Sequence, residues 1–165
     1  MPYLLLTLLL IFLDQTVKQL VLTYIPLYGS VPFLPHIMDF TYVQNTGAAF
    51  SMFSDQTWIL ALCSLLLSLA LAVAIWKKFF SHPLGRTALT LVLAGAIGNL
   101  IDRVFRGFVV DMFRTLFMEF AVFNVADICV VVGGIGAALY YVFLYDKLEG
   151  KTDKEGSHDN PEQNR

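Results

Sequence analysis

Charged side chains are scarce in this sequence of 165 residues. They make up 15% of the chain, against about 25% in soluble domains. Ten of them lie among the last twenty residues, so the first 145 residues are poorer still. Hydrophobic residues supply 57% of the chain, and the mean hydropathy is +0.66. This balance excludes an ordinary soluble domain.

Several functional signatures are absent as well. The net charge is −2 and no basic stripe runs through the sequence, so nucleic acid is not an expected partner. The two cysteines, Cys63 and Cys129, stand in apolar runs and predict neither a disulfide framework nor a zinc site; each is expected to be a small buried side chain. The three histidines are scattered without metal-ligand spacing. We therefore expect no metal and no cofactor.

Four long apolar stretches dominate what is present. An α-helix needs about 20 apolar residues to cross a bilayer, because lipid offers backbone N–H and C=O groups no partners. Four stretches meet this length: residues 3–25, 58–76, 87–105 and 124–145. The predicted fold class is therefore an all-α membrane protein with four transmembrane helices, built as one membrane domain over residues 1–145. Small residues spaced four apart, such as Ala94 and Gly98, predict that the third and fourth spans approach closely.

Basic residues indicate the orientation. Residues 77–86 hold three Lys or Arg and the start of the C-terminal segment holds three more, against none in 26–57 and two in 106–123. Both termini are therefore expected to face the cytoplasm. Residues 146–165 alternate acids and bases with Gly, Ser, Asn and Pro, so we expect a disordered, charged cytoplasmic tail.

The longer outer connection contains segments that favour β-structure. Residues 40–43 and 49–52 have high strand propensity, and turn-forming residues stand between them at 45–47. We expect a small β-sheet with loops at the outer membrane face.

Charges in or beside the apolar spans need an explanation. A charge in a span costs at least about 2.5 kcal/mol on insertion scales, so each one is first treated as a functional hypothesis. At about 1.5 Å per residue, Lys18 and Asp102 each lie roughly 22 Å from the inner boundary, and Asp127 lies roughly 27 Å from it. The charges therefore gather near the outer face. The six residues are Asp14, Lys18, Asp102, Arg103, Asp111 and Asp127.

Two pairs among these have simple structural interpretations. Asp14 and Lys18 are four residues apart with the acid first, so they form either a self-neutralising pair that permits insertion or part of a site. Asp102 and Arg103 either reach toward water at the membrane surface or contribute to a site. As adjacent helix residues they point in different directions and need not pair with each other.

Asp111 and Asp127 differ from these pairs. Neither has a basic residue at helical spacing, and their sequence neighbours are apolar. Burial and like charge both disfavour ionisation, so two such carboxyls that met would share a proton or find a cation. One protonated and one ionised carboxyl can act on water as general acid and general base. From the residues alone, a catalytic pair, a proton or ion relay and a structural pair remain open.

Five short motifs follow one another along residues 3–145. They are Asp14-Gln15 with Lys18, Asn45-Thr46-Gly47-Ala48-Ala49-Phe50, Gly95-Ala96-Ile97-Gly98-Asn99-Leu100-Ile101-Asp102-Arg103, Val109-Val110-Asp111 and Phe123-Asn124-Val125-Ala126-Asp127. In this order, and on four spans, they resemble the motifs of bacterial lipoprotein signal peptidase, or signal peptidase II.

The resemblance implies an aspartic endopeptidase. It would be a multi-pass protein of the bacterial cytoplasmic (inner) membrane with its active site at the extracytoplasmic face. Such an enzyme removes signal peptides from prolipoproteins by cutting before the cysteine that carries a diacylglyceryl group. The implied partners are these prolipoproteins and membrane lipids, and the chain is expected to be a monomer.

The resemblance also implies roles for residues. Asp111 and Asp127 match the catalytic pair of the family. The remaining matches line the site, orient the substrate, or lie next to the site or on the surface sheet that holds substrate: Asn99, Arg103, Asn124, Asp102, Asp14, Lys18, Asn45 and Gly47.

Two other classes of protein compete with this interpretation. A small proton-coupled membrane carrier would also place carboxylates in spans, but would spread them through the midplane and show repeat symmetry. A membrane assembly factor would tolerate asparagine at both Asp111 and Asp127, whereas a protease would not.

Overall fold

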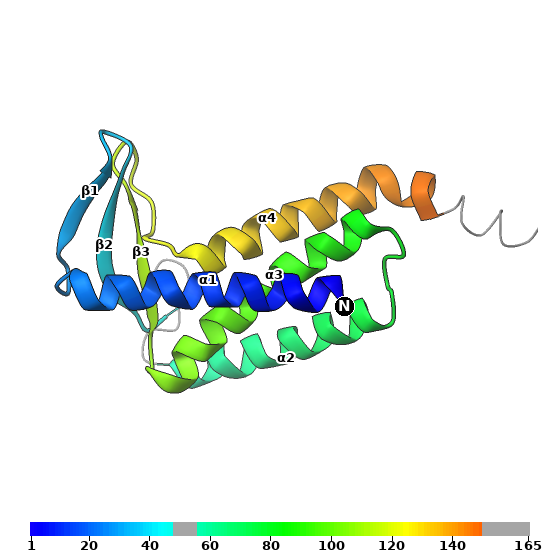
Figure 1. Cartoon of the computed structure of the whole chain (residues 1–165), viewed down its shortest axis with the longest axis horizontal. Helices are drawn as coiled ribbons and strands as arrows, with labels where there is room; N and C mark the ends of the chain where they lie inside the picture. Colours follow the sequence, from blue (N-terminus) through cyan, green and yellow to red (C-terminus); the bar gives the residue numbers. More distant parts are fainter. Residues whose placement is uncertain (48–55, 150–165) are drawn as a thin grey trace, which may run out of the picture.

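Four long helices form the body of the molecule (Figure 1). The computed structural model describes residues 1–47 and 56–149. Each helix, counting the extension of the last one, is long and apolar enough to cross a membrane, which confirms the four predicted spans. The helices are α1 (Pro2–Tyr24), α2 (Thr57–Trp76), α3 (Pro83–Phe105) and α4 (Val125–Leu139).

Capping residues determine where the last two helices begin. The third helix begins four residues before the predicted start, because Pro83 suits a first helical turn and His82 caps it with its side chain. The predicted first residue of the fourth span, Asn124, is instead the N-cap of α4. Its side chain and that of Asp127 each accept the backbone N–H of the other residue, which forms a capping box.

The fourth helix continues past its predicted end. A π-helical segment, Tyr140–Leu144, is followed by helix through residue 149, so the first residues of the predicted tail are helical. Glu149 accepts hydrogen bonds from two backbone N–H groups of the α2–α3 loop and from the Tyr140 hydroxyl. These contacts hold the helix end against the loop. The rest of the predicted tail, residues 150–165, lies outside the described residues.

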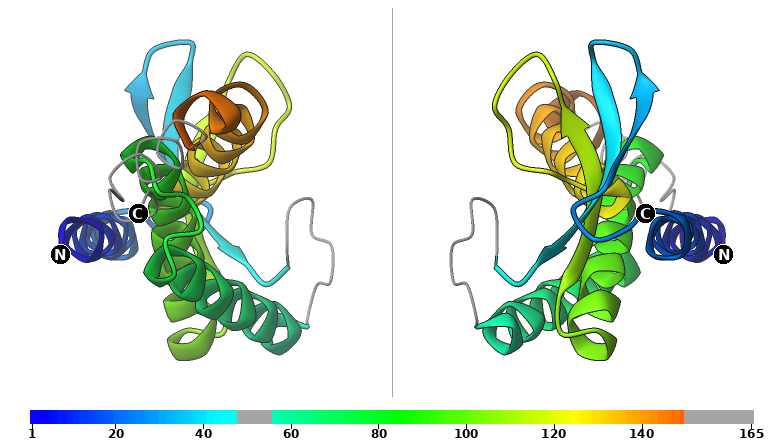
Figure 2. Two further views of the ribbon diagram at one scale, coloured as in Figure 1. Left: turned by 90° about the vertical axis from the view of Figure 1, so that its right-hand side faces the viewer. Right: turned by 90° about the vertical axis from the view of Figure 1, so that its left-hand side faces the viewer.

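The third helix is the centre of the bundle and packs against each of the other three (Figure 2). Large apolar side chains on the other helices are exposed on the outside, for example Leu8, Leu66 and Val131. This pattern suits helices that face lipid. Cys129 is buried as expected, but the expectation for Cys63 is wrong, because it is exposed on the outer surface of α2.

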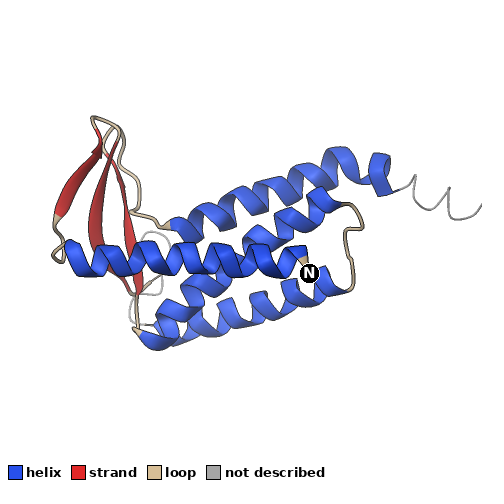
Figure 3. Ribbon diagram, viewed as in Figure 1, coloured by secondary structure: helices blue, strands red, loops and turns tan. Residues whose placement is uncertain are grey.

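A three-stranded antiparallel sheet lies across one end of the bundle (Figure 3). Its strands, in spatial order, are β1 (Ser30–Leu34), β2 (Met38–Asn45) and β3 (Val109–Thr115). The N-terminus and the end of α4 lie at the opposite end of the bundle (Figure 1).

The predicted small sheet is confirmed, with different pairing. Residues 40–43 lie in β2 as expected, but their partners are β1 and β3, neither of which was predicted. Residues 49–52 lie outside the described residues. The third strand packs against α1 and β2 through a small core, so Asp111 stands on a strand rather than in a transmembrane helix.

Glycine lets α3 and α4 approach as predicted. A Cβ on Gly95 would overlap the carbonyl oxygen of Ala126, and one on Gly133 would lie 2.7 Å from the carbonyl oxygen of Ala88. By contrast, a Cβ on Gly134 would meet no described atom within 4 Å. Two of these glycines are therefore required by backbone proximity, and the third is not.

We predict opposite effects of alanine at two of these positions. Gly95→Ala forces α3 away from α4 and should lower the free energy of unfolding by about 1–3 kcal/mol, the usual cost of overpacking. Gly134→Ala should be neutral or stabilise by up to about 1 kcal/mol, because alanine favours helix over glycine. Thermal unfolding of the detergent-solubilised proteins measures both. Equal transition temperatures for the two variants would contradict the close packing at Gly95.

Candidate active site

Two carboxylates from different elements line one cavity at the sheet end of the bundle. Asp111 lies in the middle of β3, and Asp127 lies in the first turn of α4. The cavity has a volume of about 440 Å³, and Asn45, Asn99 and Arg103 also line it. The structure thus brings together five of the residues that the sequence predicts for the site.

Asn124 joins the two carboxylates. It is fully buried, and its Nδ2 donates to Asp111 Oδ1 at 2.6 Å. Its backbone N–H donates to Asp127 Oδ2 at 3.1 Å, and its Oδ1 accepts the backbone N–H of Asp127 at 2.9 Å. The residue that caps α4 therefore also fixes how the two carboxylates lie relative to each other.

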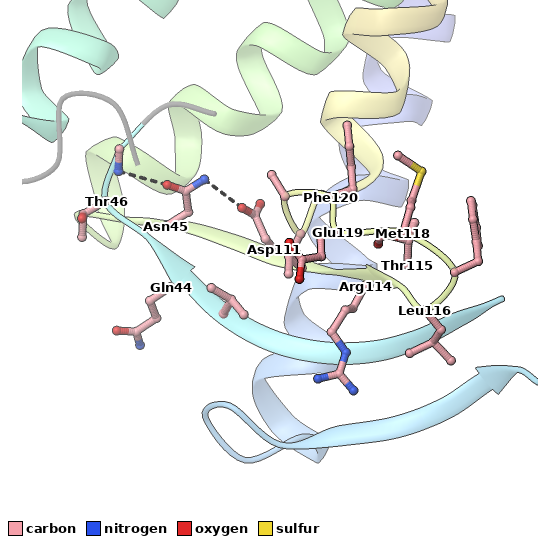
Figure 4. A pocket seen from close by; sticks show the side chains of 15 residues that line it. Gln44, Asn45, Thr46, Asp111, Arg114, Thr115, Leu116, Met118, Glu119 and Phe120 are labelled. Atoms are coloured by element: carbon pink, nitrogen blue, oxygen red, sulfur yellow. Dashed lines mark hydrogen bonds between the residues drawn. The ribbon is translucent and has the colours of Figure 1, made fainter. Parts of the chain in front are cut away.

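Two more asparagines bind the remaining carboxylate oxygens. Asn45 Nδ2 donates to Asp111 Oδ2 at 2.9 Å, and Asn99 Nδ2 donates to Asp127 Oδ1 at 2.7 Å. The backbone N–H of Gly47 donates to Asn45 Oδ1 at 3.0 Å and so turns the amide group toward Asp111 (Figure 4). Each of the four carboxylate oxygens therefore accepts a hydrogen bond.

Lys18 determines how the Asn99 amide is turned. Its Nζ donates to Asn99 Oδ1 at 2.9 Å. An ammonium group can only donate, so the NH₂ end of Asn99 must face the other way, toward Asp127. A chain of fixed donors thus runs from Lys18 to the Asp127 carboxylate.

The two carboxyls lie in unequal surroundings. Burial, and secondly the negative charge of Asp127, raise the pKa of Asp111 from its ordinary 3.8 to about 7. Hydrogen bonds from Asn45 and Asn124 and the charge of Lys18 act in the opposite direction and do not cancel this rise. Near pH 7 the protonated form of Asp111 is therefore well populated. Asp127 lies at a helix N-terminus, where the partial positive charge of the backbone N–H groups favours a negative charge.

The predicted pair of Asp14 and Lys18 forms and also touches the site. The Lys18 ammonium lies 2.9 Å from Asp14 Oδ2, and both side chains are buried. The same ammonium lies 3.0 Å from Asp102 Oδ2 and donates to Asn99. The two residues therefore neutralise each other and also contact the site, so both interpretations left open for this pair apply.

Of the two interpretations left open for Asp102, the one in which it reaches toward water is wrong. Its side chain is fully buried and accepts hydrogen bonds from Gln15 and the backbone of Val110, besides its ion pairs with Lys18 and Arg106. Arg106 and Gln15 were not predicted as neighbours of the site. The four-residue spacing of Asp102 and Arg106 could have indicated that Arg106 pairs with Asp102.

Arg103 points in a different direction from Asp102. Its guanidinium donates to Ser64 Oγ on α2 at 3.4 Å, and its side chain lines the cavity that holds the two aspartates. Asp102 and Arg103 form no ion pair with each other in the described structure, as expected for adjacent helix residues.

A second, larger hollow adjoins the cavity. It has a volume of about 1070 Å³ and follows β2, β3 and the loop 116–122 (Figure 4). Asn45 and Asp111 line both spaces. The smaller cavity continues along apolar residues of α4 that include Ile128 and Val131, which are exposed on the outer surface of the helix. A groove along the sheet and an apolar strip along a helix therefore meet at Asp111.

The arrangement suits activation of water. One protonated and one ionised carboxyl can hold a water molecule between them as general acid and general base. Within residues 1–47 and 56–149, no group of three or more His, Cys, Asp or Glu side chains is placed to hold a metal ion. Two aspartates in one cavity at the end of a membrane bundle define the class of membrane-embedded aspartic hydrolases.

Comparisons with known proteins give the family. The profile described as Signal peptidase (SPase) II matches residues 6–143. The lipoprotein signal peptidase of Clostridium acetobutylicum is 41% identical over 144 residues, which cover 86% of this chain and 94% of that protein. The lipoprotein signal peptidase of Streptococcus pneumoniae is 43% identical over 149 residues, which cover 87% and 92%. This chain belongs to the signal peptidase II family.

A solved structure agrees with this assignment. A bacterial membrane enzyme determined by the in meso method at 2.3 Å matches with a TM-score of 0.79 and 25% identity, covering 99% of this chain and 94% of the other. The chain is accordingly a multi-pass membrane protein and an aspartic signal peptidase that removes the signal peptides of lipoproteins.

Proposed function

We propose that Asp111 and Asp127 are the catalytic residues, which together activate a water molecule that hydrolyses the peptide bond at the end of the signal peptide. One observation carries the proposal: the two carboxylates come from β3 and α4, line the same cavity, and are joined by Asn124. Both open alternatives for this pair are weaker. A structural pair has no need of a cavity beside both carboxylates. A carrier would spread its carboxylates through the midplane, whereas both of these lie at the sheet end of the bundle.

The unequal surroundings assign the roles. Asp127, at the N-terminus of α4, is ionised and takes a proton from water as the hydroxyl oxygen attacks the carbonyl carbon. Asp111, with its raised pKa, is protonated and donates its proton to the carbonyl oxygen. When the tetrahedral intermediate collapses, Asp127 passes its proton to the leaving nitrogen, and Asp111 recovers its own. The pair thus returns to its starting state.

The neighbouring polar residues divide into two groups. The side-chain amides of Asn45 and Asn99 each donate to a carboxylate, and the fully buried Asn124 donates to Asp111, so we assign these amides to orienting the aspartates. Arg103 lines the cavity and forms no ion pair within the described residues. We assign Arg103 to orienting the substrate, as a donor to its peptide carbonyls.

The two hollows suit a substrate with a peptide part and a lipid part. An extended peptide can follow the groove along the sheet to Asp111. Acyl chains can lie against the exposed apolar strip of α4 that includes Ile128 and Val131. Burial of acyl chains supplies about 0.8 kcal/mol per CH₂ group, which localises a substrate without a large binding surface. We infer that the substrate is a prolipoprotein bearing diacylglyceryl-cysteine, cut before that cysteine.

The distribution of basic residues supports a topology. The α2–α3 loop and the end of α4 lie at the end of the bundle opposite the sheet (Figure 1). The loop carries Lys77 and Lys78, Arg86 lies in the first turn of α3 beside it, and Lys147 lies near the end of the helix that continues α4. At the sheet end, Arg106 and Arg114 are paired with aspartates. The positive-inside rule then places both termini in the cytoplasm and the active site at the outer face of the bacterial cytoplasmic membrane. We propose that the peptidase acts there as a monomer, with the segment after residue 149 as a separate cytoplasmic tail.

Asparagine at either aspartate should abolish cleavage. Asp111→Asn or Asp127→Asn keeps the side-chain shape but can act neither as acid nor as base, so the rate should fall by at least about 10²-fold. Purified variants are incubated with a diacylglyceryl-modified prolipoprotein, and the products are identified by mass spectrometry. Asp146→Asn is the matched control, because Asp146 is exposed in the last helical turns of the chain, at the end of the bundle opposite the sheet, and should leave turnover near that of the parent. Full turnover by either catalytic variant would refute the assignment.

Lipid modification of the substrate should decide whether it is cleaved. One precursor is prepared with and without the diacylglyceryl group and is offered to the enzyme in the same detergent or vesicles. We expect the modified form to be cleaved and the unmodified form to remain intact, because only the former places its cysteine beside the apolar strip of α4. Equal rates for the two forms would show that the lipid is not recognised.

A further inference from the structure

We propose that Asp14, Lys18 and Asp102 form a buried bridge that sets the separation of the two catalytic aspartates. The inference rests on the proposed function, since it gives the bridge a role in that reaction. The bridge consists of one ammonium between two carboxylates: Lys18 Nζ lies 2.9 Å from Asp14 Oδ2 and 3.0 Å from Asp102 Oδ2. All three side chains are buried.

One end of the bridge holds the segment that carries Asp127. Asp14 Oδ1 accepts the backbone N–H of Ala126 at 2.9 Å, one residue before Asp127. This N–H belongs to the first turn of α4, where backbone donors have no partner within the helix. The first span thus fixes the start of the fourth helix through one charged hydrogen bond.

The other end holds the segment that carries Asp111. Asp102 Oδ2 accepts the backbone N–H of Val110 at 3.0 Å, one residue before Asp111. The two ends are therefore equivalent: each buried carboxylate binds the N–H of the residue that precedes a catalytic aspartate. Lys18 joins the two carboxylates, so the positions of β3 and α4 are tied to one ammonium group.

Charge neutralisation alone does not require this arrangement. The pair of Asp14 and Lys18 would already be neutral, yet Lys18 also binds Asp102, and Arg106 balances the second carboxylate. The third donor of Lys18 goes to Asn99, which binds Asp127. Each of the three groups that bind the ammonium therefore also binds β3 or α4, the elements that carry the catalytic aspartates.

Gly98 allows Asp14 to reach across α3. A Cβ at this position would lie 2.7 Å from Asp14 Oδ2 and 3.2 Å from the Cβ of Ala126. Alanine at position 98 would therefore push the Asp14 carboxylate away from Ala126 without changing any charge. This provides a second way to disturb the bridge.

The bridge acts on the aspartates and not on the substrate. Asp14, Lys18 and Asp102 are not among the residues that line the two hollows in the described part of the chain. A change in the bridge should therefore lower kcat and leave KM nearly unchanged. Misplacement of a catalytic group by about 1 Å can lower the rate about 10²-fold, and we expect a fall in kcat of this size.

The test compares two variants with the same charge. In full-length protein, Asp14→Ala removes the acceptor of the Ala126 N–H. Asp14→Asn keeps the side-chain shape, but the Lys18 ammonium can only donate and must face the amide oxygen, so the NH₂ group faces the Ala126 N–H and cannot accept it. We expect both variants to lower kcat about 10²-fold. Gly98→Ala should behave like Asp14→Ala, and it serves as the second variant if Asp14→Ala does not fold.

A stability control separates positioning from folding. Gly133→Ala disturbs the packing of α3 and α4 near Ala88 and should lower the melting temperature while leaving the kcat of the folded enzyme unchanged. A wild-type kcat in Asp14→Asn or in Gly98→Ala, or a loss confined to KM, would overturn the proposal.

A measurement without substrate keeps the two proposals distinguishable. Hydrogen exchange of the Ala126 backbone amide, followed by NMR on selectively labelled protein, should be slow in the parent and faster in Asp14→Ala and in Asp14→Asn. If the parent enzyme cleaves no lipoprotein, the proposed function fails, and the amide measurement still tests the bridge. If the parent is active and the Ala126 amide exchanges equally in all three proteins, the bridge fails alone.

Discussion

Lys18 has no exposed surface, and its ammonium binds three oxygen atoms from α1 and α3. Removing a charge from water costs several kcal/mol even after relaxation, and only good geometry with full hydrogen bonding offsets this. The cost restricts what can surround Lys18: two carboxylates and one amide oxygen must face it, and they must stay there. Those three groups in turn bind the backbone of α4, the backbone of β3, and the Asp127 carboxylate. The geometry of the active site therefore depends on the need to satisfy one buried cation.

The same reasoning explains why the site is rich in asparagine. A carboxylate in a membrane-embedded cavity needs hydrogen-bond donors, and a further cation in contact with it would fix its negative charge. Neutral amides supply donors without doing so, and each of the three amides is held in one orientation by a group that can only donate. These groups are Lys18 for Asn99, the Asp127 backbone N–H for Asn124 and the Gly47 backbone N–H for Asn45. The amide hydrogen bonds lower the pKa of Asp111 but do not cancel the rise that burial and the charge of Asp127 cause.

The spans were predictable from the sequence because apolar length is a local property. Asp111 and Asp127 stood out as unexplained charges, but only the resemblance to the family implied that they form a catalytic pair. The strand that carries Asp111 could not be predicted, because a short apolar run such as residues 108–113 is compatible with both strand and helix. The burial of Asp102 could not be predicted either, because it depends on its ion pair with Lys18 of another helix. The network around the aspartates required knowledge of which helix faces which, and no spacing within a single span contains that information.

The most direct test of the account is the rate of cleavage as a function of pH, measured with the lipid-modified precursor. Two interacting carboxyls titrate as a unit, so the profile should be bell-shaped and neither limb belongs to one residue. Burial raises the pKa of Asp111 to about 7, so we expect the pair to lose its acidic proton near neutral pH. The rate falls above neutral pH because the pair loses its acidic proton, and it falls at low pH because the base becomes protonated. Chelators should leave the profile unchanged. A rate that rises steadily to pH 9, or one that is lost with a chelator and restored by zinc, would contradict the central role of the two aspartates.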